Sequence, residues 1–335
     1  MAETFYHLAD YKQTGLMHVE KGKECEDAVR VIYSPKAQAA VAALSDGAGS
    51  YKHAAEGARI TVETAAEILS ERFDELYQMP ESEAVQIILE EIRTRLRLAS
   101  EEQGGGEIIH YSATLLCAVL ADDGRNMYLH VGDGLIAGCD MDGKCRVLSS
   151  YVHDIAPNYT TFVTIEDTDY HFHRGKGDIS EFLLMSDGPE PYLKYGDELA
   201  GKGDLLAELS FFYSADFIAP EMKALTEELQ KNGMTDDASF AVIADKRCAG
   251  NVFYKLSSNS MLNLFGLQKQ QMTKDERRKI QKVFEDLATE DCVSEKQLGG
   301  AQYLHKYSEK IFDKLQNFLE CGSLELLEGN YYRFP

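Results

Sequence analysis

The stretch Val41-Ala-Ala-Leu-Ser-Asp-Gly-Ala-Gly-Ser50 decides how this chain is interpreted, because an apolar run ends there in an acid among small residues. The run 38–45 has the length and composition of a buried strand. Asp46 would project a carboxylate from the end of that strand. Gly47, which has no side chain, lets a ligand or another backbone approach closely. The stretch therefore predicts a strand that delivers an acidic group to a binding site.

Other acidic residues flank apolar runs in the same way: Glu26-Asp27, Asp133, Asp187 and Asp237. Any single Asp-Gly is also a common hairpin turn, so no one position is decisive. Several such strand ends meeting at one edge of a sheet would gather carboxylates that repel one another unless cations are present. Oxygen ligands of this kind suit Mg²⁺ or Mn²⁺. The pattern as a whole favours a divalent metal site.

Residues 1–245 alternate short, β-rich apolar runs with a few long amphipathic stretches. Turn signals such as Asp122-Asp-Gly124 join closely spaced runs, which favours antiparallel meanders. The expected strands are 28–33, 38–45, 112–121, 126–132, 134–139, 160–165, 168–174, 181–186 and 238–244. Helical spacing of apolar residues predicts helices at 53–72, 81–102, 203–212 and 215–232. The expected fold class is α+β: a central antiparallel β-sandwich flanked by helices, followed by a small, mostly helical C-terminal domain.

The charge of the chain is spread unevenly. The 335 residues include 34 Lys plus Arg and 56 Asp plus Glu, a formal net charge of −22. Residues 1–245 hold 20 basic and 44 acidic residues (−24), and residues 246–335 hold 14 and 12 (+2). The change of character places a domain boundary near Lys246. The strong negative charge disfavours nucleic acid or an anionic membrane as a partner of the whole chain.

The cysteines and the N-terminus indicate a cytoplasmic protein. Seven cysteines, an odd number with no CxxC pair, predict free and mostly buried thiols rather than a disulfide framework or a zinc knuckle. The N-terminus lacks the basic and apolar regions of a secretory signal. No apolar stretch approaches the ~18 residues that a membrane helix needs. We therefore expect no membrane association.

The last ninety residues have a pattern of their own. An amphipathic helix is expected at 273–290, where Thr273 and Glu276 form a capping box. A short helix after Ser294, a helix at 307–320 and a hairpin between 324 and 334 complete the series. This order is the outline of a winged-helix module. Because the candidate recognition helix balances Lys with Glu and Asp, a protein partner of this domain is favoured over DNA.

The ordered motifs of residues 15–245 resemble the metal-dependent protein phosphatase 2C family, in the form of a bacterial subgroup. The matching segments are Gly15-Leu-Met-His18, Cys25-Glu-Asp-Ala28, Asp46-Gly-Ala-Gly-Ser50, Gly57-Ala58, Ser112-Ala-Thr114, Val131-Gly-Asp-Gly134, Ser186-Asp-Gly188 and Asp236-Asp237. The family fold, a β-sandwich of two antiparallel sheets flanked by helices, agrees with the independent prediction above. Acid-nucleophile phosphatases, by contrast, need an Asp where this chain has Leu44.

The resemblance implies a centre of two Mg²⁺ or Mn²⁺ ions, with a possible third, whose ligands would be Glu26, Asp46, Gly47, Asp133, Asp187 and Asp237. Asp46 would bridge the two ions, and the Gly47 carbonyl would ligate one of them. Asp187 and Asp237 would complete the first ion's ligands, so these two and Asp46 are the catalytic candidates. Glu26 would hold the shell of the second ion. Asp133 with Asp187 matches the place where some bacterial members bind a third, weaker ion.

Three positions depart from the family pattern. Ala48 stands where many members carry a histidine that is a candidate general acid, and the spacing of His53 does not justify giving it that role. The basic residue that grips phosphate in many eukaryotic members has no clear match, and His18, Lys21 and Lys23 are the candidates. Asp133 is followed by Gly134-Leu135 instead of the usual Ser-Arg. Of other motifs, His171 and His173 are expected at surface strand positions.

The implied activity is hydrolysis of phosphoserine and phosphothreonine on proteins by a metal-activated water, without a covalent phospho-enzyme. A phosphorylated protein would be the substrate. Two alternatives remain open. Ala48 and the missing phosphate-gripping residue favour a non-catalytic, phosphatase-like binding or scaffold protein. A phosphatase that acts on a small phosphorylated molecule would use the same metal site.

Overall fold

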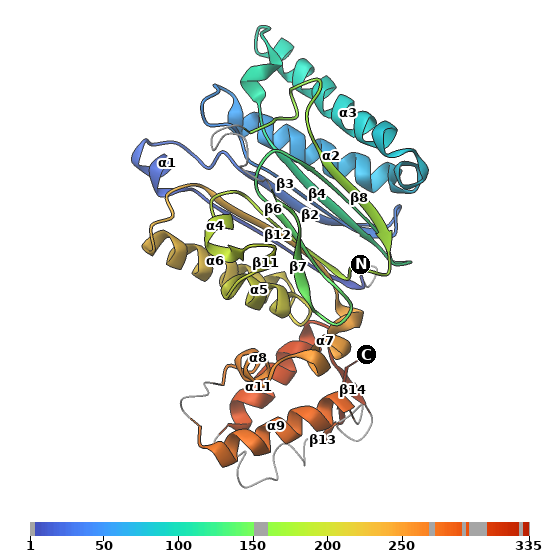
Figure 1. Ribbon diagram of the computed structural model, residues 1–335, viewed down its shortest axis with the longest axis vertical. Coiled ribbons are helices and arrows are strands. Elements are labelled where there is room, and N and C mark those ends of the chain that lie inside the picture. The colour runs from blue at the N-terminus through green and yellow to red at the C-terminus, as the bar shows by residue number, and fades with distance from the viewer. Residues whose placement is uncertain are drawn as a thin grey trace.

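The structure is a computed structural model of the chain. It describes residues 4–150, 160–267, 272–289, 293–294, 307–327 and 331–334. Two five-stranded antiparallel sheets form its centre (Figure 1). The first sheet has the order β2(Ala28–Ser34), β3(Ala39–Ser45), β4(Leu115–Ala121), β5(Arg125–Val131), β8(His171–Lys176). The second has the order β1(Tyr6–Gln13), β12(Ala238–Asp245), β9(Glu181–Met185), β6(Leu135–Cys139), β7(Cys145–Ser150). The expected antiparallel β-sandwich is confirmed.

Strand β3 explains why the opening stretch is apolar at every position. Ala40, Ala42 and Leu44 face the second sheet, in the core between the two layers. Val41 and its alternate neighbours face the opposite way, toward the helices that cover the first sheet. A strand buried on both faces has no side on which polar residues are favoured. Its run of apolar residues therefore ends only where the strand reaches the edge of the sandwich, at Asp46.

Helices cover both outer faces of the sandwich (Figure 1). On the first sheet lie α2(Ala54–Gln78) and α3(Glu81–Glu102), both inserted between β3 and β4. On the second lie α5(Lys202–Ser210) and α6(Ala215–Lys231). Small elements fill the connections: α1(Leu16–Glu20), a 3₁₀ helix η1(Ile108–Tyr111), α4(Glu190–Leu193), and the short pair β10(Lys194–Tyr195) and β11(Glu198–Leu199). The helices expected from apolar spacing are thus present, with α2 longer than predicted.

Three strand predictions need correction. Strand β1 was not expected, because its outer half is polar, and it pairs with β12 from the far end of the sandwich region. Strand β7 was also missed. Residues 160–165 form turns rather than a strand, because the carbonyls of Val163 and Ile165 accept hydrogen bonds from the Arg93 guanidinium instead of a neighbouring strand.

The C-terminal region begins directly after β12. Its described elements are η2(Lys246–Cys248), α7(Ala249–Lys255), α8(Ser258–Leu264), α9(Lys274–Thr289), β13(Val293–Ser294), α11(Ser308–Glu320), β14(Glu325–Leu327) and β15(Tyr331–Arg333). The capping box of α9 is present, because Thr273 N–H donates to Glu276 Oε2 (2.7 Å) and Glu276 N–H to Thr273 Oγ1 (3.2 Å). The predicted hairpin is β14–β15, with β13 on its other edge. The predicted helix after Ser294 lies outside the described residues.

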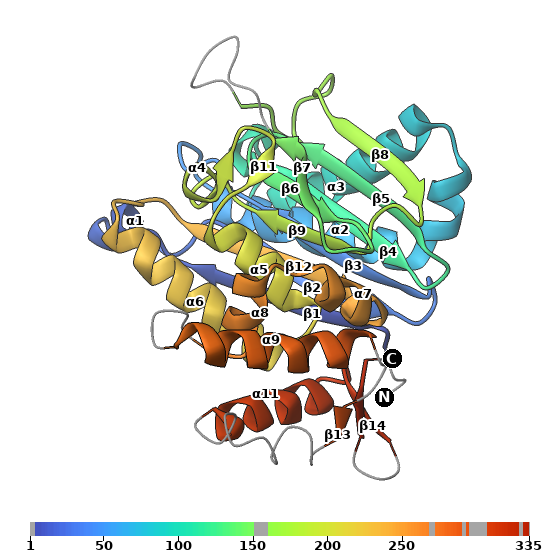
Figure 2. The same cartoon turned by 60° about the horizontal axis from the view of Figure 1, so that its bottom comes forward.

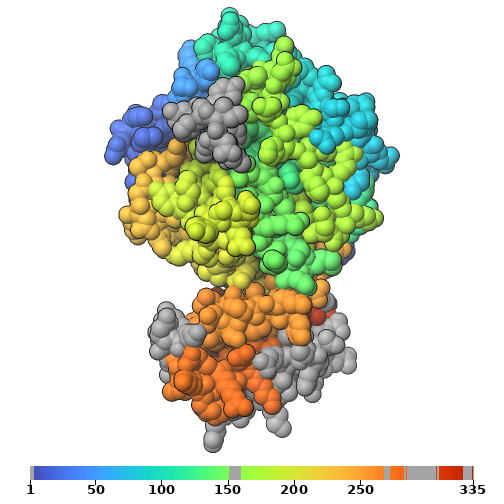
Figure 3. All heavy atoms as spheres, in the orientation of Figure 1, coloured from blue at the N-terminus to red at the C-terminus, as the bar shows by residue number. Residues whose placement is uncertain are grey.

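The C-terminal region packs on the second sheet's side of the molecule, opposite α2 and α3 (Figures 1 and 2). In the space-filling view it is a lobe below the sandwich (Figure 3). Aromatic rings pack at the interface between the sandwich and the C-terminal region, which we call the seam. There the Phe212 centroid lies 5.6 Å from that of Phe318 and 6.2 Å from that of Phe253. The buried His7 ring on β1 has its nitrogens 2.8 Å from the Ser210 carbonyl oxygen and 3.0 Å from the Cys321 carbonyl oxygen.

The cysteines differ from the prediction at one place. Cys139 on β6 and Cys145 on β7 are opposite each other in the β-ladder and form a disulfide. The expectation of free thiols is therefore wrong for this pair, because a hairpin brings together two residues that are six apart in sequence. The other cysteines of the described residues, Cys25, Cys117, Cys248 and Cys321, are free. None of the described helices is both long and apolar enough to cross a membrane.

Candidate metal centre

Three of the expected acids meet where strands end on one edge of the sandwich. Asp46 follows β3, Asp133 lies between β5 and β6, and Asp187 follows β9. One carboxylate oxygen from each lies within 4.8 Å of those from the other two. Strands β3 and β5 belong to the first sheet, and β6 and β9 belong to the second. The packing of the two sheets therefore brings these acids together.

Backbone contacts fix Asp46 at this edge. Its N–H donates to Thr114 Oγ1 (2.9 Å), and the Thr114 N–H donates to the Asp46 carbonyl (2.9 Å). Gly47 continues the pairing in a bridge with Ala113. A Cβ on Gly47 would lie 2.6 Å from the Ala54 carbonyl oxygen, so only glycine fits there. The segment Ser112-Ala-Thr114, matched in sequence to the family, thus acts as the clamp that holds the Asp46 turn.

Asp133 is positioned by its own loop and by a neighbour. Thr160 Oγ1 donates to its carboxylate Oδ2 at 2.5 Å, and the His130 Nε2 atom lies 3.2 Å from its carbonyl oxygen. His130 is buried, with Nδ1 2.7 Å from Ser149 Oγ, and burial lowers the pKa of its imidazole to about 4. A neutral His130 therefore supports the backbone of the loop that carries Asp133.

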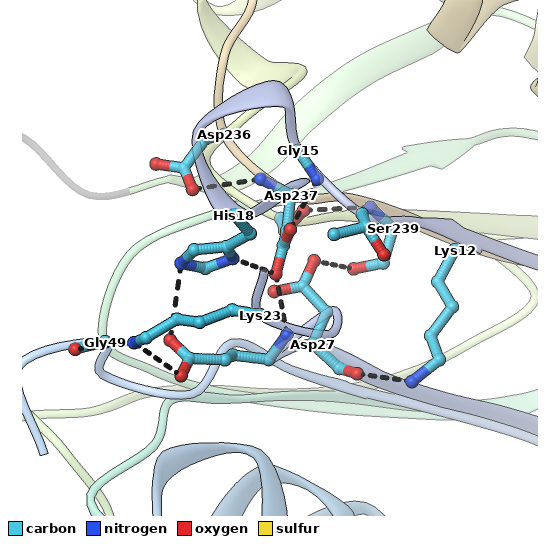
Figure 4. Close-up of polar contacts among 12 residues, drawn as sticks. Lys12, Gly15, His18, Lys23, Asp27, Gly49, Asp236, Asp237 and Ser239 are labelled. Carbon is cyan, nitrogen blue, oxygen red and sulfur yellow. Dashed lines mark hydrogen bonds and ion pairs between the residues drawn. The ribbon is translucent and has the colours of Figure 1, made fainter. Parts of the chain in front are cut away.

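Asp237 lies deeper and is held by three donors (Figure 4). Its carboxylate, 3% exposed, accepts hydrogen bonds from the N–H groups of Gly15 and Glu26, each at 2.6 Å. The His18 Nδ1 atom lies 3.0 Å from Asp237 Oδ2. The other His18 nitrogen lies 3.5 Å from Glu26 Oε2, so the ring stands between two expected metal ligands.

Lys23 completes this side of the centre. Its ammonium donates to Glu26 Oε1 at 3.0 Å and reaches the Gly49 carbonyl at 3.4 Å (Figure 4). Both Lys23 and His18, the candidate phosphate-binding residues, therefore lie at the acidic cluster. Lys21 lines the same cavity. His53, which sequence spacing could not place, instead stacks on Tyr111 with ring centroids 4.8 Å apart, and it is not among the residues that line this cavity.

Asp27 is the acid that the predicted ligand set omitted. It precedes β2 as Asp46 follows β3, and the pairing of Ala28 with Ser45 sets the two aspartates opposite each other. The Asp27 carboxylate is fully buried and accepts a hydrogen bond from Ser239 Oγ at 2.7 Å. Burial raises its pKa to about 6. The sequence signal for Asp27 was present in the Glu26-Asp27 dipeptide.

The electrostatics of the cluster favour bound cations. Burial and the neighbouring charges of Asp27, Asp187 and Asp133 raise the pKa of Asp46 well above its usual value. Burial, Asp133 and Asp236 raise the pKa of Asp187 to about 8. Carboxylates this close hold protons in the absence of other positive charge, and a divalent cation relieves their repulsion. The oxygen-only donor set fits Mg²⁺ or Mn²⁺.

A cavity of about 490 Å³ opens over these acids. Asp46, Asp133, Glu26 and Asp236 line it, with His18, Lys21 and Lys23 on one side and Tyr51 and Phe162 among its apolar walls. Its lining is predominantly polar, with both acidic and basic side chains. His171 and His173, which were expected at surface strand positions, lie on β8 and do not line it: His171 contacts Ser149 (3.1 Å), and His173 contacts Asp178 (3.7 Å).

Comparison with known proteins identifies the family and structures of the same fold. The protein phosphatase 2C family model matches residues 14–237. A comparison with curated protein sequences finds no match. Three solved structures share the fold. The S. agalactiae serine/threonine phosphatase is 14% identical with a TM-score of 0.52, and the match covers 71% of this chain and 99% of that one.

The other two structures also have less than 20% sequence identity to this chain. The serine/threonine phosphatase Stp1 from Staphylococcus aureus is 14% identical with a TM-score of 0.50, covering 71% of this chain and 94% of that one. PppA of Pseudomonas aeruginosa, described as a regulatory component of T6SS, is 19% identical with a TM-score of 0.50, covering 72% and 98%. At these identities the likeness shows the fold. The family match spans well over half of the chain, so this chain belongs to the protein phosphatase 2C family.

Proposed function

We propose that the chain hydrolyses phosphoserine and phosphothreonine on proteins at a centre of two Mg²⁺ or Mn²⁺ ions. The observation that carries this proposal is the meeting of Asp46, Asp133 and Asp187, whose carboxylate oxygens lie within 4.8 Å of one another, with Asp46 and Asp133 lining the cavity. When bound, the two ions would acidify a water molecule and neutralise charge on the phosphoryl oxygens. Family membership supports the metal dependence.

Each acid has a role in holding the ions. Asp46 would bridge them, with the Gly47 carbonyl, Asp187 and Asp237 completing the first and Glu26 supporting the second. Asp133, paired with Asp187, would hold a third ion. Asp27 lies buried beside Asp46 and keeps that carboxylate in place. The donors on Asp237, including the Gly15 N–H, fix its orientation before any ion binds.

Basic side chains would position the phosphoryl group. Lys23 and His18 line the cavity beside Glu26, where the Lys23 ammonium would contact an incoming phosphate dianion. Ala48 supplies no proton donor to the leaving alkoxide. In this proposal the leaving group takes its proton from solvent in the open cavity.

A protein substrate is favoured over a small molecule by the surface beside the cavity. Helix α1 presents three exposed apolar side chains, Leu16, Met17 and Val19, of which Val19 is 60% exposed. Met17 also lines the cavity. Exposed apolar side chains beside a polar cavity suit a polypeptide that flanks a phosphorylated residue. Leu16→Ser with Val19→Ser should raise KM for a phosphoprotein and leave p-nitrophenyl phosphate turnover unchanged.

The C-terminal region would bind a protein partner. A cavity of about 350 Å³ between α8 and α9 has an apolar floor with Met261 and Phe284 and a basic rim of Lys274, Arg277 and Arg278. This chemistry suits an acidic segment that carries an apolar side chain. Helix α11 alternates Glu309, Lys310, Asp313 and Lys314 and so lacks a basic face for DNA. The order of α9, β13, α11 and the β14–β15 hairpin supports a winged-helix-like module.

The deciding experiment is Mn²⁺-dependent hydrolysis of p-nitrophenyl phosphate and of a phosphothreonine peptide by the full chain. We expect activity that a chelator removes. Asp46→Asn should lose at least about a hundredfold, because loss of a direct ligand costs more than the roughly 10–100-fold loss from an outer-shell partner. Asp216→Asn, an exposed acid on α6, is the matched control and should retain full activity.

The alternatives have distinct results in the same assay. The Ala48 position favours a scaffold protein, which would bind phosphopeptide without turnover in Mn²⁺ or Mg²⁺. Turnover of p-nitrophenyl phosphate but not of any phosphopeptide would instead indicate a small phosphorylated molecule as the substrate. Equal activity of Asp46→Asn and the unmodified chain would contradict the assigned metal centre.

A further inference from the structure

A second group of metal-binding side chains lies on the outer face of the second sheet. Cys139 ends β6 and pairs across the sheet with Glu181, the first residue of β9, on one side and with Cys145 of β7 on the other. Residues directly opposite in antiparallel strands point to the same face. One ligand atom from each of the three lies within 4.8 Å of the other two.

Glu181 is the unexplained member of this group. The residue is 0% exposed, and within the described residues neither carboxylate oxygen accepts a geometrically satisfactory hydrogen bond; its polar neighbour is Ser210, whose hydroxyl donates to the Ala207 carbonyl instead. Burial raises the pKa of the carboxyl well above its usual value. A buried carboxyl without a partner costs free energy in either protonation state, because it has lost its water without replacement. Its position beside two sulfurs therefore calls for a ligand.

The disulfide between Cys139 and Cys145 does not provide one. In the oxidised form the two sulfurs are bonded to each other, and Glu181 stays unpaired. In the reduced form the same row offers two thiolates and a carboxylate, a donor set that suits Zn²⁺. Cys145 is half-buried while Cys139 is buried, so a fourth ligand from water would approach on the Cys145 side.

We propose that Cys139, Cys145 and Glu181 form a zinc site in the reduced chain, separate from the catalytic centre. A dithiol reductant supplies the two electrons and two protons that convert the disulfide to two thiols, and itself becomes a disulfide. Zinc then displaces the protons of both thiols and of the carboxyl. Oxidation of the sulfurs and binding of zinc are mutually exclusive, because each uses the same sulfur electron pairs.

The site is remote from the catalytic acids. Asp133 precedes Cys139 by six residues along β6, and Asp187 follows Glu181 by six residues along β9. At about 3.3 Å per residue the two sites are roughly 20 Å apart on the same strands. Zinc at the cysteines therefore shares no ligand with the oxygen-only centre.

The zinc site also borders the seam with the C-terminal region. The β6–β7 turn reaches α7, where Lys255 Nζ lies 3.7 Å from Asp142 Oδ2. A Cβ on Gly143 would lie 2.7 Å from a Val252 methyl, so the turn and the helix are in close contact. Zinc bound between β6, β7 and β9 would fix the turn on which α7 rests.

The test uses Co²⁺ as a probe of the reduced full chain, because only thiolate ligands give a strong sulfur-to-cobalt charge-transfer band. We expect one equivalent of Co²⁺ to produce the band and Zn²⁺ to abolish it. Cys139→Ser with Cys145→Ser should remove it. Glu181→Gln should weaken binding by more than the roughly 10–100-fold typical of an outer-shell loss. Cys25→Ser, which alters a thiol near the catalytic acids, is the control and should keep the band.

A second measurement avoids any variant that fails to fold. In the unmodified reduced chain, Zn²⁺ should slow iodoacetamide alkylation of Cys139 and Cys145 at least about tenfold, as read by mass spectrometry, since a metal-bound thiolate is a poor nucleophile. A chelator should restore the rate. The proposal is overturned if the cobalt band is missing or if it persists in the double serine variant. It is also overturned if Glu181→Gln binds Co²⁺ with unchanged affinity, or if Zn²⁺ does not change the alkylation rate. Each of these outcomes leaves the catalytic proposal standing.

Discussion

The two outer faces of the sandwich are covered in different ways. The first sheet is covered by α2 and α3, a continuous pair of helices between two neighbouring strands. The second sheet is covered by α5 and α6 and, beyond them, by the C-terminal region, all in one apolar cluster. The first face is therefore covered by residues that are close in sequence to its own strands. The second involves contacts between residues from both ends of the chain, such as His7 and Cys321.

This difference separates the parts of the molecule by role. The catalytic acids come from strand ends of both sheets, at an edge that the C-terminal region does not reach in Figure 1. The C-terminal region carries a charge of +2 against −24 for the rest, and the family match leaves it out. The C-terminal region contacts the catalytic region through packed side chains, because the Phe318 ring lies against Phe212 in the loop after α5.

Removal of the C-terminal region should have the largest effect. The division near Lys246 remains a prediction. A 1–245 fragment lacks Phe253 and Phe318, so it exposes the buried rings of Phe212 and Tyr213 that pack on them. Burying one such side chain is worth about 1.5–3 kcal/mol, so several together are comparable with the roughly 5–15 kcal/mol of a whole domain. We expect the fragment to be poorly soluble or to unfold at much lower denaturant than the full chain.

A stable 1–245 fragment would instead support the autonomous catalytic domain expected from the sequence. A soluble 1–245 fragment with a cooperative transition near that of the full chain would show that the seam contributes little. Retained p-nitrophenyl phosphate turnover by that fragment would add that the metal centre is independent of the C-terminal region.

Single substitutions compare the two faces directly. Phe253→Ala on α7 and Phe73→Ala on α2 both remove a fully buried ring, and each should cost about 3–5 kcal/mol. If the seam joins the regions into one unit, calorimetry of Phe253→Ala shows a single transition shifted to lower temperature. Two separate transitions, with the upper one unchanged, would instead show that the C-terminal region unfolds on its own.

The pH dependence of the metal-free protein tests the acidic edge. The folded-state pKa of Asp187 is raised to about 8 from an ordinary value of 3.8, so the folded chain binds a proton that the unfolded chain has released. Stability without metal is therefore greatest near pH 4 and is lost as the pH rises toward 8. In chelator, Asp187→Asn should reduce this dependence on pH, with Asp46 and Asp27 supplying the remainder, and stabilise the chain at pH 8 by about 1–3 kcal/mol. The free energy of unfolding is measured by denaturant titration at each pH. An equal dependence of this free energy on pH in the two proteins would argue against a strained acidic cluster.

The smallest effect is expected at the rim of the cavity. Lys23→Ala removes an ammonium that lies 3.0 Å from Glu26, and we expect KM for a phosphopeptide to rise by about threefold to tenfold, since an exposed charge contributes roughly 1 kcal/mol. Lys21→Ala, at a second lysine of the same cavity, is the matched control and should change KM less. An equal change in both variants would show general attraction of the anion instead of a specific contact.

The sequence predicted much of the acidic edge, because each acid stands where an apolar strand stops. Asp46, Asp133 and Asp187 were named from that pattern and the family motifs, and they converge. Asp27 was visible as half of a dipeptide, but its burial opposite Asp46 depends on the pairing of β2 with β3. Strand β1 was missed because its outer half is polar, and its partner β12 lies more than two hundred residues away.

By itself the sequence determined most of the buried strands, the long helices and the acids at the strand ends, because these follow from apolar periodicity and from the points at which it breaks off. Only the tertiary structure decided which distant groups share an environment. The contact of His7 with Cys321 spans 314 residues, and Cys139, Cys145 and Glu181 form one row only through the register of three strands. Register and long-range packing depend on the summed burial of the whole chain, so no local pattern specifies them.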